Sequence, residues 1–273
     1  MERHIARRNN ILYEMNNRKK ALLEKIKEFR LLDDDFMSKV FEDDYECIEL
    51  LLHIIMEKSD LKVKEAHTQY TIKNLTGRSV RLDIYAVDAV GKKYNIEVQR
   101  VDKGAAAKRA RYNSSVMDAN SLVPGSDFND LPETYVIFIT EKDIMNGNKA
   151  VYHIDRVIKE TGKSFDDEAH IIYVNGAYRD KTPIGQLMHD FSCKNPNEMY
   201  FKILADKTRY FKEDEKGVTA MCKIIEDLID SEKKEIALKM LRDGKLPKEE
   251  IAKYFGLTLE QVEELERSLY VQS

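Results

Sequence analysis

The stretch RLDIYAVDAVGKKYNIEVQR, residues 81–100, constrains the fold most, because two runs of alternating apolar and polar residues flank a glycine. Alternation with a period of two is typical of β-strands, and Gly91 is a favourable turn residue between the two runs. We therefore predict a β-hairpin from strands over 79–87 and 93–99. A third strand over 63–72 precedes them and completes an antiparallel meander.

Helical patterns and buried strands surround this meander. The apolar spacing of residues 43–57 predicts an amphipathic helix before it, and residues 102–119 predict another helix after it. Two continuous apolar runs, 134–140 and 170–175, are typical of central buried strands. Helical patterns dominate from about 183 to the end. The sequence thus predicts an α/β fold with a mixed central β-sheet flanked by helices, plus a C-terminal all-helical appendage.

The same patterns divide the chain into three regions. Residues 9–30 have helical spacing that the segment LLDDDF, residues 31–36, interrupts. We therefore predict an N-terminal helical extension over 1–32, an α/β domain over 33–213 and a C-terminal helical region over 214–273. A chain of 273 residues is long enough for one substantial core and an appendage of this kind.

Composition narrows the functional classes. The net charge of −4 excludes a protein that binds nucleic acid through a global positive field, so any such contact needs a local basic patch. The three cysteines form no CxxC or Cys/His cluster, which argues against a zinc site and a disulfide framework. No apolar run of about 18 residues and no signal peptide occurs, so we expect a cytoplasmic protein without membrane association.

The polar sides of the predicted hairpin carry one carboxylate each, Asp83 and Glu97. If the strands pair around Gly91 in an even register, these residues face each other with Cβ atoms about 4.5–5.5 Å apart. Like charges this close repel unless a cation lies between them, and Mg²⁺ commonly uses one or two carboxylates. Spacing alone is equally compatible with two acids on a solvent-facing hairpin.

This stretch resembles the core motif of the PD-(D/E)XK nucleases, in which an Asp ends one strand and a Glu-x-Lys or Glu-x-Gln triplet lies on the next. It is most similar to the recombination-promoting nuclease / putative transposase family, whose triplet is Glu-x-Gln. The resemblance extends from about residue 33 onward and includes the helix at 45–57, KRARYN (108–113), TYVIFIT (134–140) and the closing segment 238–265.

The resemblance implies a restriction-endonuclease-like core and a metal-dependent endonuclease that hydrolyses DNA phosphodiester bonds in recombination or transposition. The implied cofactor is Mg²⁺, with Mn²⁺ as a substitute. The implied catalytic residues are Asp83, Glu97 and Gln99. Gln99 occupies the position of the motif lysine, and because glutamine cannot titrate, it can orient a water but not activate it by proton transfer. The resemblance therefore predicts weak activity.

The resemblance also implies a set of metal ligands, namely Asp83, Glu97, the backbone carbonyl of Val98 and a glutamate of the preceding helix. Glu49 is the first candidate for that glutamate, and Glu46 is the second. The alternative for Glu49 is a solvent-exposed glutamate at the edge of the apolar helix face.

A basic segment follows the hairpin and offers candidate phosphate contacts. The predicted helix carries Lys108, Arg109, Arg111 and Tyr112. Arginine binds phosphate in bidentate fashion, and an aromatic ring stacks on a splayed base, so we assign these four residues to DNA binding. The alternatives are a solvated helix face and arginines paired with the acids of the hairpin.

The C-terminal segment 248–269 has the pattern of a helix-turn-helix, but its second helix carries four glutamates, which phosphate would repel. We interpret it as a helical hairpin for packing or protein contact. The apolar stripe over about 218–243 predicts a homodimer contact through the C-terminal helices. Two alternatives to the nuclease remain open: a catalytically inactive binding or regulatory module that acts through these helices, and a DNA-binding regulator that uses them.

Overall fold

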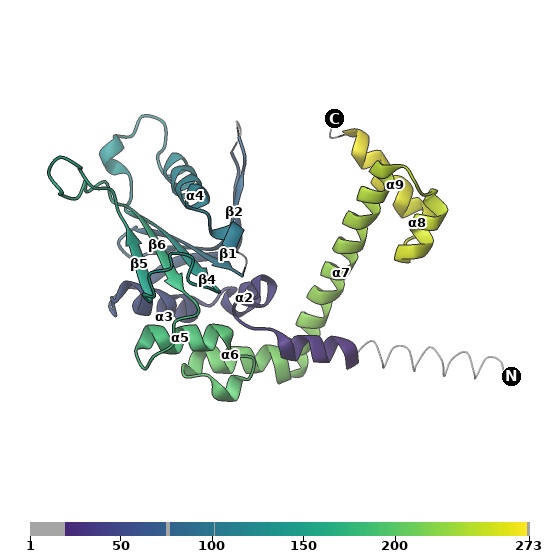
Figure 1. The fold of residues 1–273 in the computed structure, drawn as a ribbon, viewed down its shortest axis with the longest axis horizontal. Coiled ribbons are helices and arrows are strands. Elements are labelled where there is room, and N and C mark those ends of the chain that lie inside the picture. The colour runs from purple at the N-terminus through teal and green to yellow at the C-terminus, as the bar shows by residue number, and fades with distance from the viewer. Residues whose placement is uncertain (1–19, 75–76, 101, 272–273) are drawn as a thin grey trace. The chain divides into compact units, whose positions relative to one another are not determined.

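The computed structural model describes residues 20–74, 77–100 and 102–271. The chain divides into two compact units, of which the larger spans Glu24–Asp214. The described residues of the other unit are 20–23 and 215–271 (Figure 1). Helical residues 20–28 are the described part of the predicted N-terminal helix, and residues 9–19 lie outside the described range.

A mixed sheet forms the centre of the larger unit. Its six described strands run in the order β1-β2-β3-β4-β6-β5. The strands are β1 (Val63–Ile72), β2 (Val80–Asp88), β3 (Lys93–Gln99), β4 (Thr134–Thr140), β5 (Val151–Ile154) and β6 (Ala169–Asn175). The first three form an antiparallel meander, β3, β4 and β6 are parallel, and β5 pairs antiparallel to β6 at the edge. This confirms the predicted α/β class, while β5 is too short, at four residues, and too exposed to have been predicted.

The β2–β3 turn fixes the register of the hairpin. Gly91 has a φ of +92°, which glycine adopts at little cost. Before it, the Asp88 side chain accepts hydrogen bonds from the amides of Val90 and Lys92, at 3.0 and 2.9 Å. The strands then pair from Val87↔Lys93 to Ile84↔Ile96.

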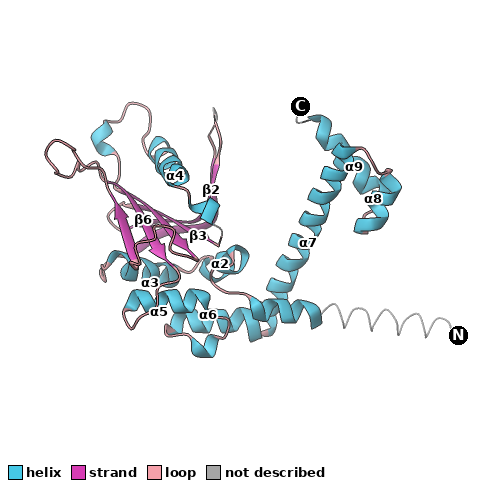
Figure 2. Cartoon of the chain, viewed as in Figure 1, coloured by secondary structure: helices cyan, strands magenta, loops and turns pink. Residues whose placement is uncertain are grey.

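Helices cover both faces of the sheet (Figure 2). Helix α4 lies on one face, and α2, α3, α5 and α6 lie on the other. These helices are α2 (Asp34–Phe41), α3 (Tyr45–Met56), α4 (Ala107–Ala119), α5 (Pro183–Ser192) and α6 (Lys202–Glu213). Short 3₁₀ helices lie at Asp102–Ala105, Phe128–Asp130 and Pro196–Glu198. The predicted helix over 102–119 therefore begins with a separate 3₁₀ turn.

Helix α2 is a correction to the sequence reading, which treated LLDDDF as a break. The helix forms because its apolar residues recur on one face, and Phe36, Met37, Val40 and Phe41 are all fully buried. Leu31 and Leu32, just before it, are also buried. The three aspartates hid this pattern, although acids are favourable in the first turn of a helix.

The C-terminal unit is helical throughout its described residues. It contains α7 (Glu215–Asp243), α8 (Lys248–Phe255) and α9 (Leu259–Val271). The second half of α7 packs against α8 and α9 around buried Ala237, Ile251 and Val262. Gly256 ends α8 in the left-handed conformation, with a φ of +63°. In the described part of the chain, no helix is long and apolar enough to span a membrane.

Candidate functional site

The carboxylates of the hairpin lie together and are buried. The register of β2 and β3, continued one step beyond the pair Ile84↔Ile96, places Asp83 directly across from Glu97. Asp83 is 6% exposed and Glu97 is fully buried, so the pair is not a solvent-facing feature of the hairpin. The amide of Val98 donates a 2.9 Å hydrogen bond to Asp83 Oδ2, which ties the Asp83 carboxylate to β3.

Burial makes the ionised form of this pair costly. Desolvation raises the pKa of Asp83 above its ordinary value, and the negative charge of Glu97 raises it further. Desolvation also raises the pKa of Glu97, while the positive charge of Arg109 opposes that rise. Two acids held this way favour the binding of a cation, because the cation offsets the cost of burying the charged carboxylates and their mutual repulsion.

Arg109 contacts Glu97 directly. Its Nη2 lies 2.5 Å from Glu97 Oε2, and its Nη1 donates to the Gly104 carbonyl at 2.9 Å. The guanidinium also lies over the Phe138 ring, 5.8 Å from the centroid. Asn113 Nδ2 donates to the other oxygen, Glu97 Oε1, at 3.3 Å. Arg109 therefore forms the pair with a hairpin acid that was the alternative to phosphate binding, because a residue next to Lys108 is rotated about 100° around the helix toward the sheet. Its assignment to DNA stays a prediction.

Gln99 lies at the end of β3, beside the carboxylate pair, and its amide packs over Gly104. A Cβ atom at position 104 would lie 1.9 Å from Gln99 Oε1, so only glycine leaves room for this side chain. The carbonyl of Gln99 accepts a 3.0 Å hydrogen bond from the amide of Glu141, which anchors the strand end. The backbone of Gln99 is thus fixed by Glu141, and its side-chain amide lies against Gly104.

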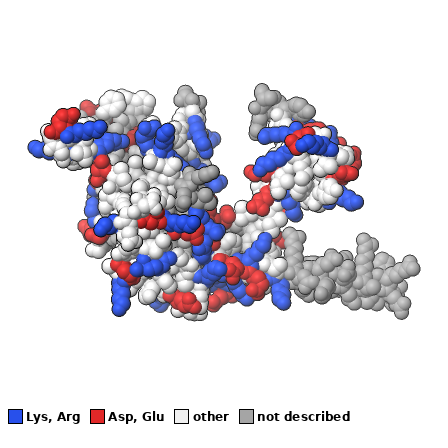
Figure 3. All heavy atoms as spheres, in the orientation of Figure 1, with Lys and Arg blue, Asp and Glu red and all other residues white. Residues whose placement is uncertain are grey.

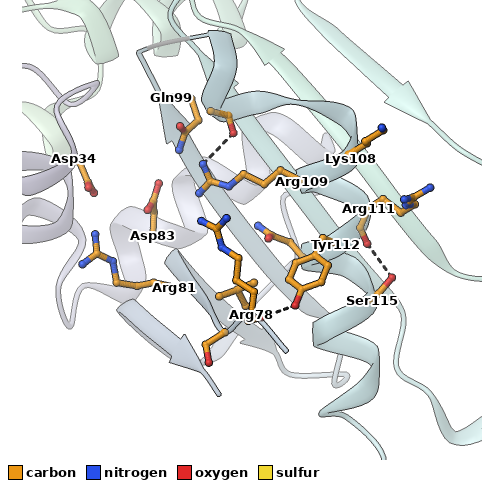
Figure 4. Close-up of a pocket in the computed structure, with 14 residues that line it drawn as sticks. Asp34, Arg78, Arg81, Asp83, Gln99, Lys108, Arg109, Arg111, Tyr112 and Ser115 are labelled. Atoms are coloured by element: carbon orange, nitrogen blue, oxygen red, sulfur yellow. Dashed lines mark hydrogen bonds between the residues drawn. The ribbon is translucent and has the colours of Figure 1, made fainter. Parts of the chain in front are cut away.

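An open groove of about 1130 Å³ contains this site (Figure 4). Asp83 and Gln99 lie between two sides that carry cations. Lys108 and Arg111 are exposed on α4, three residues apart on one helix face. Arg78 and Arg81, on the β1–β2 hairpin, line the other side. Within the described ranges, none of these four cationic side chains forms an ion pair.

Tyr112 lines the groove and also makes structural contacts, so its base-stacking role stays a prediction. Its hydroxyl donates to the Arg78 carbonyl at 2.5 Å, and its ring packs against the apolar cluster under α4. Asn74 Nδ2 donates to the same hydroxyl at 3.4 Å. Tyr112 therefore joins α4 to the β1–β2 hairpin.

The structure does not bring the glutamates of α3 to the carboxylate pair. Glu49 accepts hydrogen bonds from the amide of Val63 and from Lys62 Nζ, both at 2.9 Å. Val63 pairs with Asp88, five residues along β2 from Asp83 and so about 16 Å away. Glu46 lines a different pocket, between α3 and α6. The apolar face of α3 faces the core, so its acids lie at the helix edges.

Asp34 is the acid that sequence reasoning missed. It begins α2 and lines the groove across from Asp83. Its charge contributes to the raised pKa values of Asp83 and Glu97. Gln69 Nε2 donates to Asp34 Oδ1 at 2.9 Å, and Gln69 itself has a left-handed φ of 52°. The signal for α2 was its apolar spacing after the aspartates.

The donor set fits a hard divalent cation. Across the described residues, no three His, Cys, Asp or Glu side chains lie close enough together to hold a metal ion on their own. Two buried carboxylates with an amide nearby suit Mg²⁺, which takes oxygen ligands and keeps several positions for water and phosphate oxygens. The carbonyl of Val98 as a ligand remains a prediction.

Comparisons with known proteins agree with this geometry. Residues 35–184 match a family model described as PD-(D/E)XK nuclease family transposase. The matched span begins at the second residue of α2 and contains the carboxylate pair, Gln99 and the whole of α4. No curated protein and no solved structure matches the chain.

Proposed function

Because the chain belongs to the PD-(D/E)XK nuclease family transposases, we propose that it is a Mg²⁺-dependent endonuclease that hydrolyses DNA in recombination or transposition. One observation carries the proposal: Asp83, which is paired across the hairpin with the buried Glu97, lines a groove in which four cations, Arg78, Arg81, Lys108 and Arg111, form no ion pair among the described residues. Unpaired cations beside clustered acids suit a phosphodiester substrate. The cations bind its phosphates, and a metal ion held by the acids would contact the phosphate that reacts.

Asp83 and Glu97, with the Val98 carbonyl, would hold the metal ion. When bound, Mg²⁺ lowers the pKa of a coordinated water and neutralises charge on the phosphate. Asp34 adds negative charge across the groove, which favours a divalent cation over a monovalent one. Mn²⁺ has the same charge and also accepts oxygen ligands, so we propose it as a substitute.

The other residues of the groove hold water and substrate. The Gln99 amide orients the attacking water by hydrogen bonding and, because it does not titrate, contributes no proton transfer. Lys108 and Arg111 bind the phosphodiester from the exposed side of α4. Because no side chain of the proposed site acts as a base, we expect slow cleavage.

Cleavage of supercoiled plasmid DNA in Mg²⁺ tests this proposal. We expect Asp83→Ala to reduce the nicking rate by a factor of about 10³, because the variant loses a carboxylate beside the reacting phosphate. Asp60→Ala, an exposed acid in the turn before β1, is the matched control and should cleave like the wild type. Equal nicking by wild type and Asp83→Ala would reject the assignment.

A catalytically inactive module is the second candidate, and the contacts to both oxygens of Glu97 favour it. Calorimetry with Mg²⁺ and Mn²⁺ separates the candidates. The nuclease predicts saturable binding that Asp83→Asn abolishes, whereas the inactive module predicts no heat of binding from either ion.

The helical regions complete the proposal. We propose that residues 33–213 form the nuclease domain, with 1–32 as an extension and 214–273 as a region that pairs with a second copy of the chain. On α7, Ile236 is 43% exposed and is available for such a contact, whereas Met240 packs against the helices of its own unit. Light scattering of the wild type and of Ile236→Glu tests the dimer.

A further inference from the structure

We infer that the β1–β2 hairpin is a second DNA-binding wall, in which Arg78 and Arg81 contact backbone phosphates on the side of the carboxylate pair opposite α4. This inference rests on the proposed function, because it assigns the remaining part of the same groove. It predicts that the DNA backbone crosses the groove between two cationic walls. We call Arg78 and Arg81 the hairpin wall, and Lys108 and Arg111 the helix wall.

The positions of the two walls relative to the acids support the inference. Arg81 lies two residues before Asp83 on β2, so by the alternation of a strand it shares the face of the carboxylate. Figure 4 shows Arg78 and Arg81 on the hairpin side of the groove, with Lys108 and Arg111 on α4 across from them. The carboxylate of Asp83 therefore lines the same groove as both sets of cations, as a reacting phosphate with neighbouring phosphates on either side would require.

The charge balance of the chain makes these unpaired cations informative. The sequence contains 49 acidic and 45 basic residues, so acids are abundant enough to pair with surface cations. Other arginines of this unit do pair: Arg30 lies 2.7 Å from Glu141, and Arg100 lies 2.7 Å from Asp33. Among the described residues, the four wall cations form no such pair. Cations that lie near one another without close ion pairs repel, and binding of DNA, a polyanion, removes this repulsion and releases the salt ions condensed on the DNA.

The hairpin wall is fixed to the helix wall. The hydroxyl of Tyr112 on α4 donates to the Arg78 carbonyl at 2.5 Å and accepts from Asn74 Nδ2 at 3.4 Å. Both contacts hold the hairpin at a set distance from α4. The width of the groove is therefore built into the fold, and one extended ligand can contact both walls.

The size and polarity of the groove favour a polymeric anion. Its volume of about 1130 Å³ exceeds what a single small anion fills, and it is open to solvent (Figure 4). Its cations are spread over two elements instead of converging on one point. A chain of phosphates uses all four contacts at once, which a single phosphate cannot do.

Salt-dependent DNA binding tests the inference. Fluorescence anisotropy would measure the affinity of the full chain carrying Asp83→Asn for a labelled 20-base-pair duplex and for its labelled single strand. The measurements are made without metal ions at several NaCl concentrations. In that background we compare the double variant Arg78→Gln/Arg81→Gln with Lys108→Gln/Arg111→Gln. Arg156→Gln is the matched control, because Arg156 lies outside the groove and pairs with Asp167. Melting temperatures verify that each variant is folded.

We expect the double hairpin variant to lose at least tenfold in affinity and to flatten the plot of log K against log[salt]. The slope should fall by about 1.8 for duplex or about 1.4 for single-stranded DNA, since each phosphate contact contributes about 0.9 or 0.7. The preferred ligand is the form of DNA, duplex or single-stranded, for which the measured change in slope equals the value expected for that form. Arg156→Gln should change neither quantity.

The contrary results are separable from failure of the proposed function. If the hairpin variant keeps the parent affinity and slope while the helix-wall variant loses both, the inference is wrong and the nuclease proposal stands. If the wild type binds DNA through both walls but cleaves none in Mg²⁺ or Mn²⁺, the inference stands and the nuclease proposal is wrong. If the parent chain binds no DNA at low salt, both are wrong.

Discussion

Arg109 Nη2 lies 2.5 Å from Glu97 Oε2, so a cation of the protein occupies the carboxylate that we propose for the metal. Glu97 is fully buried, whereas the Arg109 side chain is 37% exposed and lines the groove. The pair thus joins a buried acid to a cation with room to move. Because a metal ion and a guanidinium repel each other at this distance, the two compete for Glu97.

The first prediction concerns this competition. Arg109→Gln should bind Mn²⁺ about tenfold more tightly at pH 8.5, since the competing positive charge is gone. The same variant should lose about 2–3 kcal/mol of unfolding free energy without metal, because it leaves a buried carboxylate unpaired. Calorimetry and urea unfolding measure the two effects. Arg156→Gln is the control, because it removes a positive charge that is paired elsewhere, with Asp167. Unchanged or weaker Mn²⁺ binding by Arg109→Gln would contradict the competition between Arg109 and the metal ion.

The second prediction uses the raised pKa of Asp83. Between the unfolded-state pKa and the higher folded-state pKa, the folded protein binds more protons than the unfolded chain, so stability falls as pH rises. Asp83→Asn keeps the shape of the side chain and an oxygen for the Val98 amide, but it has no charge to bury. Its unfolding free energy relative to wild type should therefore increase by about 1–3 kcal/mol from pH 4.5 to pH 8 in EDTA.

Urea denaturation at the two pH values measures this difference, and Asp60→Asn provides an exposed aspartate for comparison. A stability difference between Asp83→Asn and wild type that is the same at both pH values would show that the Asp83 carboxyl is not destabilised by burial. In a separate measurement without EDTA, Mg²⁺ should raise the unfolding free energy of the wild type and leave that of Asp83→Asn unchanged.

The third prediction concerns Gly104, where a Cβ would lie 1.9 Å from Gln99 Oε1. Gly104→Ala should displace the Gln99 amide and lower the plasmid nicking rate by about 10- to 100-fold, since a mispositioned hydrogen-bonding group costs about this much. Metal affinity should be unaffected, because Asp83 and Glu97 are untouched. In the double variant Gly104→Ala/Gln99→Ala, the nicking rate should equal that of Gln99→Ala alone. If the loss in the double variant is instead the product of the two single losses, Gly104 does not act through Gln99.

The fourth prediction concerns Gln69, which stands across from Asp83 on β1 with a φ of 52°. Its side chain donates to Asp34 Oδ1 at 2.9 Å and to Ser38 Oγ at 2.7 Å. Gln69→Gly and Gln69→Ala should weaken Mn²⁺ binding equally, because each releases Asp34. The glycine variant should be about 1 kcal/mol more stable to urea than the alanine variant, since alanine pays for a left-handed backbone. Wild-type Mn²⁺ affinity in both variants would rule out a role for the Asp34 contact.

Much of the fold follows from local patterns. The strand pattern of residues 81–100 and the turn at Gly91 predict the hairpin, and the structure has the even register that places Asp83 across from Glu97, which the pattern alone does not fix. The apolar runs 134–140 and 170–175 become central strands of the sheet. These elements are predictable because period-two alternation and continuous apolar runs each indicate a strand in a definite environment.

Other features had no sufficient local signal. Helix α2 was hidden by three aspartates, and β5 is four residues long and partly exposed. Glu49 seemed the natural helix acid from its place before the meander, yet it binds Lys62 and the Val63 amide. Which helix brings an acid to the groove depends on how α2 and α3 pack on the sheet, and their spacing in sequence does not contain that information.

Local sequence patterns account for the hairpin, for the strand faces that carry Asp83 and Glu97, and for the basic helix after it, because neighbouring residues in a strand or helix have fixed relative directions. The register that pairs the two carboxylates, the contact of Arg109 with Glu97, and the inclusion of Asp34, Arg78 and Arg81 in the same site come from the folded chain. Those relationships connect residues far apart in the chain, and they arise from the packing of α2, α4 and the β1–β2 hairpin around one sheet.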